Sequence, residues 1–91
     1  MDMRILVADD EMTGDRKPTA PDKIINALEK SGYRVEYSDT IERALTRATE
    51  SKWVIAIVEL NWPNNRNGWE VVDVLRGCPW NESSRVIMSL R

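Results

Sequence analysis

Histidine is absent from this chain of 91 residues, and cysteine occurs once, at Cys78. The absence of histidine excludes histidine general-base chemistry, phosphotransfer through a histidine of this chain and most zinc catalysis. With a single cysteine the chain forms neither an intrachain disulfide nor a metal site built from several cysteines. A reducing, cytoplasmic compartment is therefore the natural expectation.

Long apolar runs and an excess of basic charge are also missing. The longest apolar run, Trp53 to Val58, is far too short to span a bilayer, and Met1-Asp2-Met3-Arg4 lacks the apolar segment of a signal peptide. Net charge is −2, with 13 basic and 15 acidic residues, so the composition gives no sign of a nucleic-acid-binding surface. We expect neither a membrane span nor a nucleic-acid partner.

Common signatures of enzymes are absent as well. The chain has neither a glycine-rich phosphate loop nor a Gly-x-Ser-x-Gly turn. A flavin site on an α/β sheet would need phosphate-binding hydroxyl groups after the first strand. This chain carries Asp9-Asp10-Glu11 there, and these charges repel phosphate. We therefore expect a protein without enzymatic activity.

Length and a hydrophobic fraction of 42% indicate one globular domain, residues 1–91. Short apolar runs predict strands at residues 5–8, 34–37, 53–60 and 86–88, the third being the most apolar and therefore central. Polar loops are expected at 9–21 and 61–68. Helical stripes with start and stop signals predict helices from Thr19-x-x-Asp22 to Lys30 (with Gly32 after it), from Asp39-Thr40-Ile41-Glu42 to Ala48, and from Asn67 to about Arg76.

This alternation of strands and helices predicts an α/β fold with a parallel sheet and helices on both faces. The carboxyl ends of parallel strands meet at one edge of a sheet. The first strand ends in Asp9 and Asp10 and the third in Glu59, so we expect these three side chains to converge. Oxygen ligands of this kind suit Mg²⁺. The alternative is that Asp9 and Asp10 merely cap the loop and bind no metal.

Four segments resemble the receiver domain of bacterial response regulators, over the range from Arg4 to about Leu90. They are Ile5 to Glu11, Val58 to Pro63 followed by Gly68 to Val72, the turn Gly32 to Val35, and Arg85 to Met88. Each segment alone is a weak signal, but all four occur in the family's order at nearly its spacing. The resemblance implies a flavodoxin-like three-layer sandwich with a parallel sheet of order 2-1-3-4.

The chain also departs from the family pattern. Glu59 stands where the family carries its phosphoacceptor aspartate. The hydroxyl residue expected near the end of the fourth strand falls on Leu90, next to Ser89. The chain ends at Arg91, before the family's lysine, fifth strand and last helices. The resemblance is thus to a degenerate or truncated receiver.

The resemblance further implies a metal site formed by Asp9, Asp10, Glu59 and the backbone carbonyl of Asn61. We expect Mg²⁺ to bind there weakly or not at all. Glu59 extends the carboxylate by one carbon, about 1.5 Å, and in-line phosphoryl transfer tolerates such a displacement poorly. Two explanations of Glu59 stay open: a fixed negative charge near the position of a phosphoryl group, or drift after the reaction became dispensable.

These observations predict a receiver-like signalling or regulatory module that is not phosphorylated in the normal way. Its partners would be proteins, for example a histidine kinase or an output domain. The alternative is a Mg²⁺-dependent phosphoacceptor, a response-regulator fragment in a two-component phosphorelay.

Two apolar features suggest contact surfaces. Trp62, beside Pro63, is either an anchor for a partner or a residue that packs over its own loop, whereas Trp53 and Trp69 are expected in or near the core. The last predicted strand, Val86-Ile87-Met88, would leave an apolar sheet edge with unpaired backbone groups, and we expect a homodimer formed through it.

Overall fold

The computed structural model describes residues 3–10 and 20–89, and within 20–24 the backbone alone. The sheet is parallel throughout and has the order β2-β1-β3-β4, so both the predicted α/β class and the predicted strand order are confirmed. In the described ranges no helix combines the length and the apolar character needed to cross a membrane. The elements are β1 (Arg4–Ala8), α1 (Ala20–Lys30), β2 (Arg34–Ser38), α2 (Ile41–Glu50), β3 (Ile55–Glu59), α3 (Trp69–Gly77), the 3₁₀ turn η1 (Pro79–Asn81) and β4 (Arg85–Ser89).

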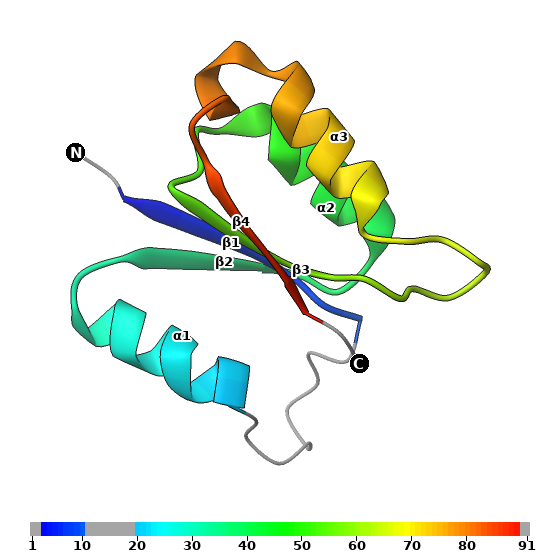
Figure 1. Cartoon of the computed structure of the whole chain (residues 1–91). Coiled ribbons are helices and arrows are strands. Elements are labelled where there is room, and N and C mark those ends of the chain that lie inside the picture. Colours follow the sequence, from blue (N-terminus) through cyan, green and yellow to red (C-terminus); the bar gives the residue numbers. More distant parts are fainter. Residues whose placement is uncertain (1–2, 11–19, 90–91) are drawn as a thin grey trace.

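Three layers result, with α2 and α3 on one face of the sheet and α1 on the other (Figure 1). Alternate residues of a strand point to opposite faces. Leu6 and Ala8 of β1 therefore join the core beneath α2 and α3, while Ile5 and Val7 join the core beneath α1. β1 and β3 are buried on both faces, which explains their unbroken apolar sequences.

Helix α1 ends as predicted. Gly32 has a φ of 95°, a left-handed conformation that glycine adopts without steric cost. The N–H of Tyr33 donates to the carbonyl of Leu28 at 3.1 Å, which closes the last turn. The helix begins at Ala20, so Pro21 lies in its first turn and not in the preceding loop. The expected cap at Thr19 falls outside the described residues.

The other two helices have side-chain caps. In α2 the cap is Thr40, one residue after the start of the predicted capping box, and its Oγ1 accepts from the N–H of Arg43 at 3.2 Å. For α3, which begins at Trp69 with Gly68 directly before it, the predicted residue Asn67 supplies the capping side chain: its Oδ1 accepts from the N–H of Trp69 at 3.0 Å. The carboxylate of Glu70 accepts from the N–H of Asn67 at 3.2 Å, which completes a reciprocal capping box.

Trp53 and Trp69 were both predicted to lie in or near the core, but only Trp53 does. β3 begins two residues later than expected, and Trp53 lies before it, 1% exposed, with its indole N–H donating to the carbonyl of Arg47 at 2.9 Å. Trp69 is 55% exposed, so the prediction that it lies in or near the core is wrong. The inward positions of α3 are Val71 and Leu75, and Trp69 falls on the opposite side of the helix.

Asn81 is a fully buried amide that ties three segments together. Its Oδ1 accepts from the N–H of Trp53 at 2.8 Å and from the hydroxyl of Ser84 at 3.3 Å. Its Nδ2 donates to the carbonyls of Ala48 at 2.8 Å and Ser51 at 3.0 Å. The amide thus joins the end of α2 to the approach of β3 and to the turn before β4, where the sequence had shown only a loop.

Replacing Asn81 by alanine should lower the free energy of unfolding by about 3 kcal/mol, because the change leaves buried backbone groups without partners. Asn26→Ala, at an exposed position of α1, is the matched control and should change it by less than about 0.5 kcal/mol. Urea unfolding at one protein concentration measures both. Equal midpoints for the two variants would contradict the structural role of Asn81.

Candidate functional site

Three carboxylates meet at the carboxyl edge of the sheet. Asp9 and Asp10 follow β1, Glu59 ends β3, and the two strands are parallel neighbours with Ala8 opposite Val58. Each of the three acids offers an oxygen within 4.8 Å of the others. The predicted convergence of Asp9, Asp10 and Glu59 is therefore confirmed, and we call these three residues the acidic cluster.

Glu59 is held in place by the backbone around it. Its side chain is almost fully buried, and its Oε2 accepts from the N–H of Asp10 at 3.3 Å. Its main-chain carbonyl accepts the indole N–H of Trp62 at 2.7 Å. The longer carboxylate thus reaches the loop after β1 and accepts a hydrogen bond from its backbone.

The residues present fit a hard divalent cation. Oxygen ligands at this spacing are those that Mg²⁺ and Ca²⁺ prefer. Oδ1 of Asp10 is buried and has no hydrogen-bond partner, so it is an acceptor that a cation would satisfy. Asn61 forms an isolated bridge with Asn67, and the role of its carbonyl as a further ligand stays a prediction.

The register of β4 places a hydroxyl residue, Ser89, next to Glu59. Glu59 pairs with Ser89, and the N–H of Leu60 donates to the carbonyl of Ser89 at 2.9 Å. Residues paired across parallel strands project on the same face, so Ser89 lies beside Glu59. The sequence resemblance assigns the family's hydroxyl position to Leu90, and this assignment stays a prediction. Leu90 itself falls outside the described residues.

The loop between β3 and α3 forms a small hairpin that extends from the sheet (Figure 1). The N–H of Arg66 donates to the carbonyl of Pro63 at 3.3 Å, and the N–H of Trp62 donates to the carbonyl of Arg66 at 3.1 Å. Between them Asn64 and Asn65 have φ angles of 63° and 58°. Two left-handed residues in succession make a type I′ turn, which asparagine tolerates better than most side chains.

Gly68 closes this hairpin against β3. Its N–H donates to the carbonyl of Leu60 at 2.8 Å. A Cβ atom at this position would lie only 2.2 Å from the carbonyl oxygen of Glu59 and 2.8 Å from Cγ1 of Val58. No residue other than glycine fits without displacing the strand end that carries Glu59.

The burial of Trp62 decides between its two predicted roles. The side chain is 7% exposed and belongs to the core beneath α2 and α3. This burial favours packing over its own loop and argues against Trp62 as an exposed anchor for a partner. Pro63, next to it, is exposed.

An ion-pair network that the sequence analysis missed anchors the hairpin to both helices. The guanidinium of Arg66 makes hydrogen bonds of 2.8–3.0 Å to both carboxylate oxygens of Glu70, and it lies 3.4 Å from the carboxylate of Glu42 on α2. The hydrogen bond from Arg66 holds the pKa of Glu70 below its ordinary value of 4.5, and the same bond raises the pKa of Arg66. The i, i+4 spacing of Arg66 and Glu70 was the sequence signal from which this ion pair could have been predicted.

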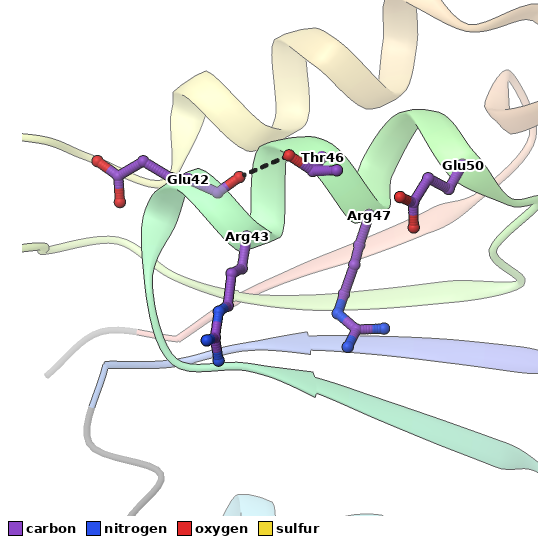
Figure 2. Close-up of a pocket in the computed structure, with 5 residues that line it drawn as sticks. All are labelled: Glu42, Arg43, Thr46, Arg47 and Glu50. Atoms are coloured by element: carbon purple, nitrogen blue, oxygen red, sulfur yellow. Dashed lines mark hydrogen bonds between the residues drawn. The ribbon is translucent and has the colours of Figure 1, made fainter.

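Two hollows lie near α2, and they differ in chemistry. The larger, about 380 Å³, runs along the outer face of the helix (Figure 2). Its two arginines are already paired: Arg43 lies 3.3 Å from Asp39, and Arg47 lies 3.5 Å from Glu36. These are features of a solvated helix face. The smaller hollow, about 150 Å³, borders the acidic cluster through Asp10.

The last strand presents two different sides. Val86 and Met88 pack partly against the core beneath α2 and α3, whereas Ile87, on the opposite face, is 51% exposed. In the part of the chain that the structure describes, the outer edge of β4 pairs with no strand.

Comparison with known proteins identifies the fold. No family model and no curated protein matches the chain. Solved structures do match, each at 22% identity. One is a CheY-like response regulator receiver domain protein from Methanospirillum hungatei, with a TM-score of 0.74 over 99% of this chain and 65% of that one. Another is the chemotaxis protein CheY4 of Vibrio cholerae, with a TM-score of 0.72 over 97% of this chain and 68% of that one.

A third match is a response regulator protein from Burkholderia pseudomallei, whose structure contains a phosphorylated aspartic acid, a calcium ion and citrate. Its TM-score is 0.73, over 98% of this chain and 47% of that one. The chain thus spans about half to two thirds of the length of the structures it matches. Its described part has the CheY-like receiver fold, as the sequence resemblance implied.

Gly68→Ala should destabilise the chain by about 2 kcal/mol, because overpacking against a strand end is costly. It should also shift the fluorescence of Trp62, whose indole bonds to the same Glu59 carbonyl. Gly77→Ala is the control, since a Cβ atom there meets nothing within 4 Å. Thermal unfolding and emission spectra of both variants make the comparison. An unchanged Gly68→Ala protein would show that the close approach to Glu59 carries no strain.

Proposed function

We propose that this chain is a receiver-like signalling or regulatory module that acts through protein contacts and does not accept a phosphoryl group in the normal way. The observation that carries this proposal is the place of Glu59. It ends the central strand β3 and lies in the acidic cluster. By the sequence resemblance it stands where the family carries its phosphoacceptor aspartate. A receiver-like role also agrees with the absence of enzyme motifs from the sequence, and we propose no catalytic activity.

The contacts of Glu59 support a structural or electrostatic role. Its carboxylate accepts the N–H of Asp10 and sits among two other acids. To accept a phosphoryl group, the Glu59 carboxylate would have to give up its hydrogen bond from the N–H of Asp10. The phosphoryl group would also lie one carbon farther from the strand than on aspartate. Glu59 therefore serves as a constant negative charge at the edge of the sheet.

Asp9, Asp10 and Glu59 are the residues that would hold a divalent cation. When bound, the ion would neutralise the mutual repulsion of the three carboxylates. The protein itself positions these ligands through the parallel register of β1 and β3, and it shields Glu59 from solvent.

The second candidate function is a Mg²⁺-dependent phosphoacceptor that belongs to a longer response regulator in a phosphorelay. Two observations favour it: the acidic cluster is complete, and Ser89 supplies a hydroxyl side chain beside Glu59. In the solved response regulator from Burkholderia pseudomallei the phosphorylated residue is an aspartic acid, which is the residue this chain lacks at position 59.

Incubation with Mg²⁺ and acetyl phosphate, followed by intact-mass measurement, separates the two functions. The wild-type mass should not change. Glu59→Asp should gain the mass of one phosphoryl group, since aspartate restores the shorter acceptor among the same neighbours. Glu59→Gln is the control, because it keeps the length and removes the nucleophile. A Mg²⁺-dependent adduct on wild-type Glu59 would overturn the proposal in favour of the phosphoacceptor.

We further propose that the contacts include a second copy of the chain, paired through β4. Antiparallel pairing of two β4 strands about a two-fold axis at Ile87 places Arg85 opposite Ser89, so that like charges do not meet. It brings two half-exposed Ile87 side chains together and satisfies the backbone groups of the β4 edge. Val86 and Met88 would support this edge from the core. A histidine kinase or an output domain would be a further partner.

Sedimentation velocity of the 91-residue chain should show a dimer at high micromolar concentration. Ile87→Lys should shift it to the monomer, because a charge would enter the pairing surface. Trp80→Lys, at a similarly exposed apolar position in η1, is the control and should leave the dimer intact. A monomer for the unchanged chain over the whole concentration range would rule out pairing through β4.

A further inference from the structure

One asparagine of this chain is followed directly by glycine. Asn67 precedes Gly68, whereas the other asparagines precede larger residues. In an Asn-Gly pair the backbone nitrogen of the glycine can attack the side-chain carbonyl carbon of the asparagine, because the glycine has no side chain to hinder the approach. Asparagine is among the thermally labile residues, and this pair is its most reactive sequence context. The sequence therefore carries the chemistry of spontaneous deamidation where the β3–α3 loop meets α3.

The folded chain restrains both reacting groups. The N–H of Gly68 must lose its proton before the nitrogen can attack, and it donates to the carbonyl of Leu60 at 2.8 Å. The side-chain carbonyl of Asn67 must receive the attack, and its Oδ1 accepts from the N–H of Trp69 at 3.0 Å. Gly68 is also buried and packs directly against the carbonyl of Glu59. Neither group is free to approach the other while these contacts last.

The contacts that hold this segment closed lie at the surface. Glu70 accepts from the N–H of Asn67 at 3.2 Å and binds the guanidinium of Arg66 at 2.8–3.0 Å. The side chain of Asn67 is itself exposed. Local opening of surface hydrogen bonds costs less than unfolding of the core. Once the hairpin opens, water and hydroxide therefore reach the reacting groups at once.

We propose that Asn67 is a deamidation site that reacts only when the hairpin opens at Gly68. In the open form hydroxide takes the proton of the Gly68 nitrogen, and a bond forms between this nitrogen and Cγ of Asn67. The bond from Cγ to Nδ2 breaks, and ammonia leaves with a proton from water. Water then adds to either carbonyl of the succinimide ring, which yields aspartate or isoaspartate. The sequence of steps consumes only water.

The products would alter the strand end that carries Glu59. In isoaspartate the main chain runs through Cβ and Cγ of residue 67 and is one atom longer, so the close fit of Gly68 against β3 would be lost. Either product adds a carboxylate next to Glu70, which already accepts from the N–H of residue 67. Deamidation would thus loosen the hairpin irreversibly. The inference goes beyond the function proposed above and does not depend on whether Glu59 accepts a phosphoryl group.

The test incubates the chain in mildly alkaline buffer, both folded and in concentrated urea, and follows deamidation by peptide mapping with mass spectrometry. In urea Asn67 should react first among the asparagines, since it alone precedes glycine. In the folded chain it should react at least ~10-fold more slowly, the factor set by an opening free energy of about 1.4 kcal/mol. Equal rates in the two conditions would overturn the proposal.

Glu70→Ala removes the contacts that hold the hairpin closed and leaves both reacting groups in place. It should speed deamidation of the folded chain ~5-fold, which corresponds to about 1 kcal/mol, and it should not change the rate in urea. Asp73→Ala, at an exposed position of the same helix, is the matched control and should change neither rate. Equal rates for the two folded variants would contradict protection by the hairpin.

Amide hydrogen exchange separates opening of the hairpin from unfolding of the whole chain. The N–H of Gly68 exchanges only when its bond to Leu60 breaks, so Glu70→Ala should speed this exchange by the same factor as deamidation. The N–H of Leu6, in the buried strand β1, should keep its protection. Faster exchange at both positions would show that global unfolding exposes Asn67 and would sink the proposal. None of these results bears on the phosphodonor experiment, which is read from a phosphoryl adduct.

Discussion

Mutual repulsion among three buried or half-buried carboxylates is the constraint around which this chain is organised. One oxygen of each acid lies within 4.8 Å of the others, and two unit charges at that limit repel by about 3.5 kcal/mol at an effective dielectric constant of about 20. The parallel register of β1 and β3 nevertheless brings Asp9, Asp10 and Glu59 together. The N–H of Asp10 offsets part of this cost by donating to the Glu59 carboxylate. The indole of Trp62 and the close contact of Gly68 hold the strand end that carries Glu59.

The same contacts connect the acidic cluster to the surface of the protein. Trp62 links Glu59 to the core, and the type I′ hairpin carries the chain from Trp62 to Arg66. Arg66 in turn binds α2 through Glu42 and α3 through Glu70. A shift of the strand end at Glu59 would therefore displace the hairpin and the groups that hold it to α2 and α3.

Periodicity and turn chemistry were sufficient to predict a parallel sheet and the convergence of the acids, because short apolar runs that end in acid alternate with helices. The strand order came from the resemblance to receiver domains. These sequence signals failed where contacts between distant segments determine the position of a side chain. Trp69 was expected in or near the core although the inward stripe of α3 is Val71 and Leu75. Asn81 gave no signal beyond that of a turn, since its four hydrogen bonds join segments distant in sequence.

The proposed role of Glu59 is that of a fixed charge in the acidic cluster and not that of an acceptor. A crystal structure of the chain grown with Mg²⁺ and beryllofluoride, which mimics a phosphoryl group on a carboxylate, tests this role most directly. We expect the three carboxylates to lie together, Glu59 to keep its contact with the N–H of Asp10, and no beryllofluoride to be bonded to it. A beryllofluoride adduct on Glu59, with Ser89 turned toward it, would show that Glu59 is an acceptor.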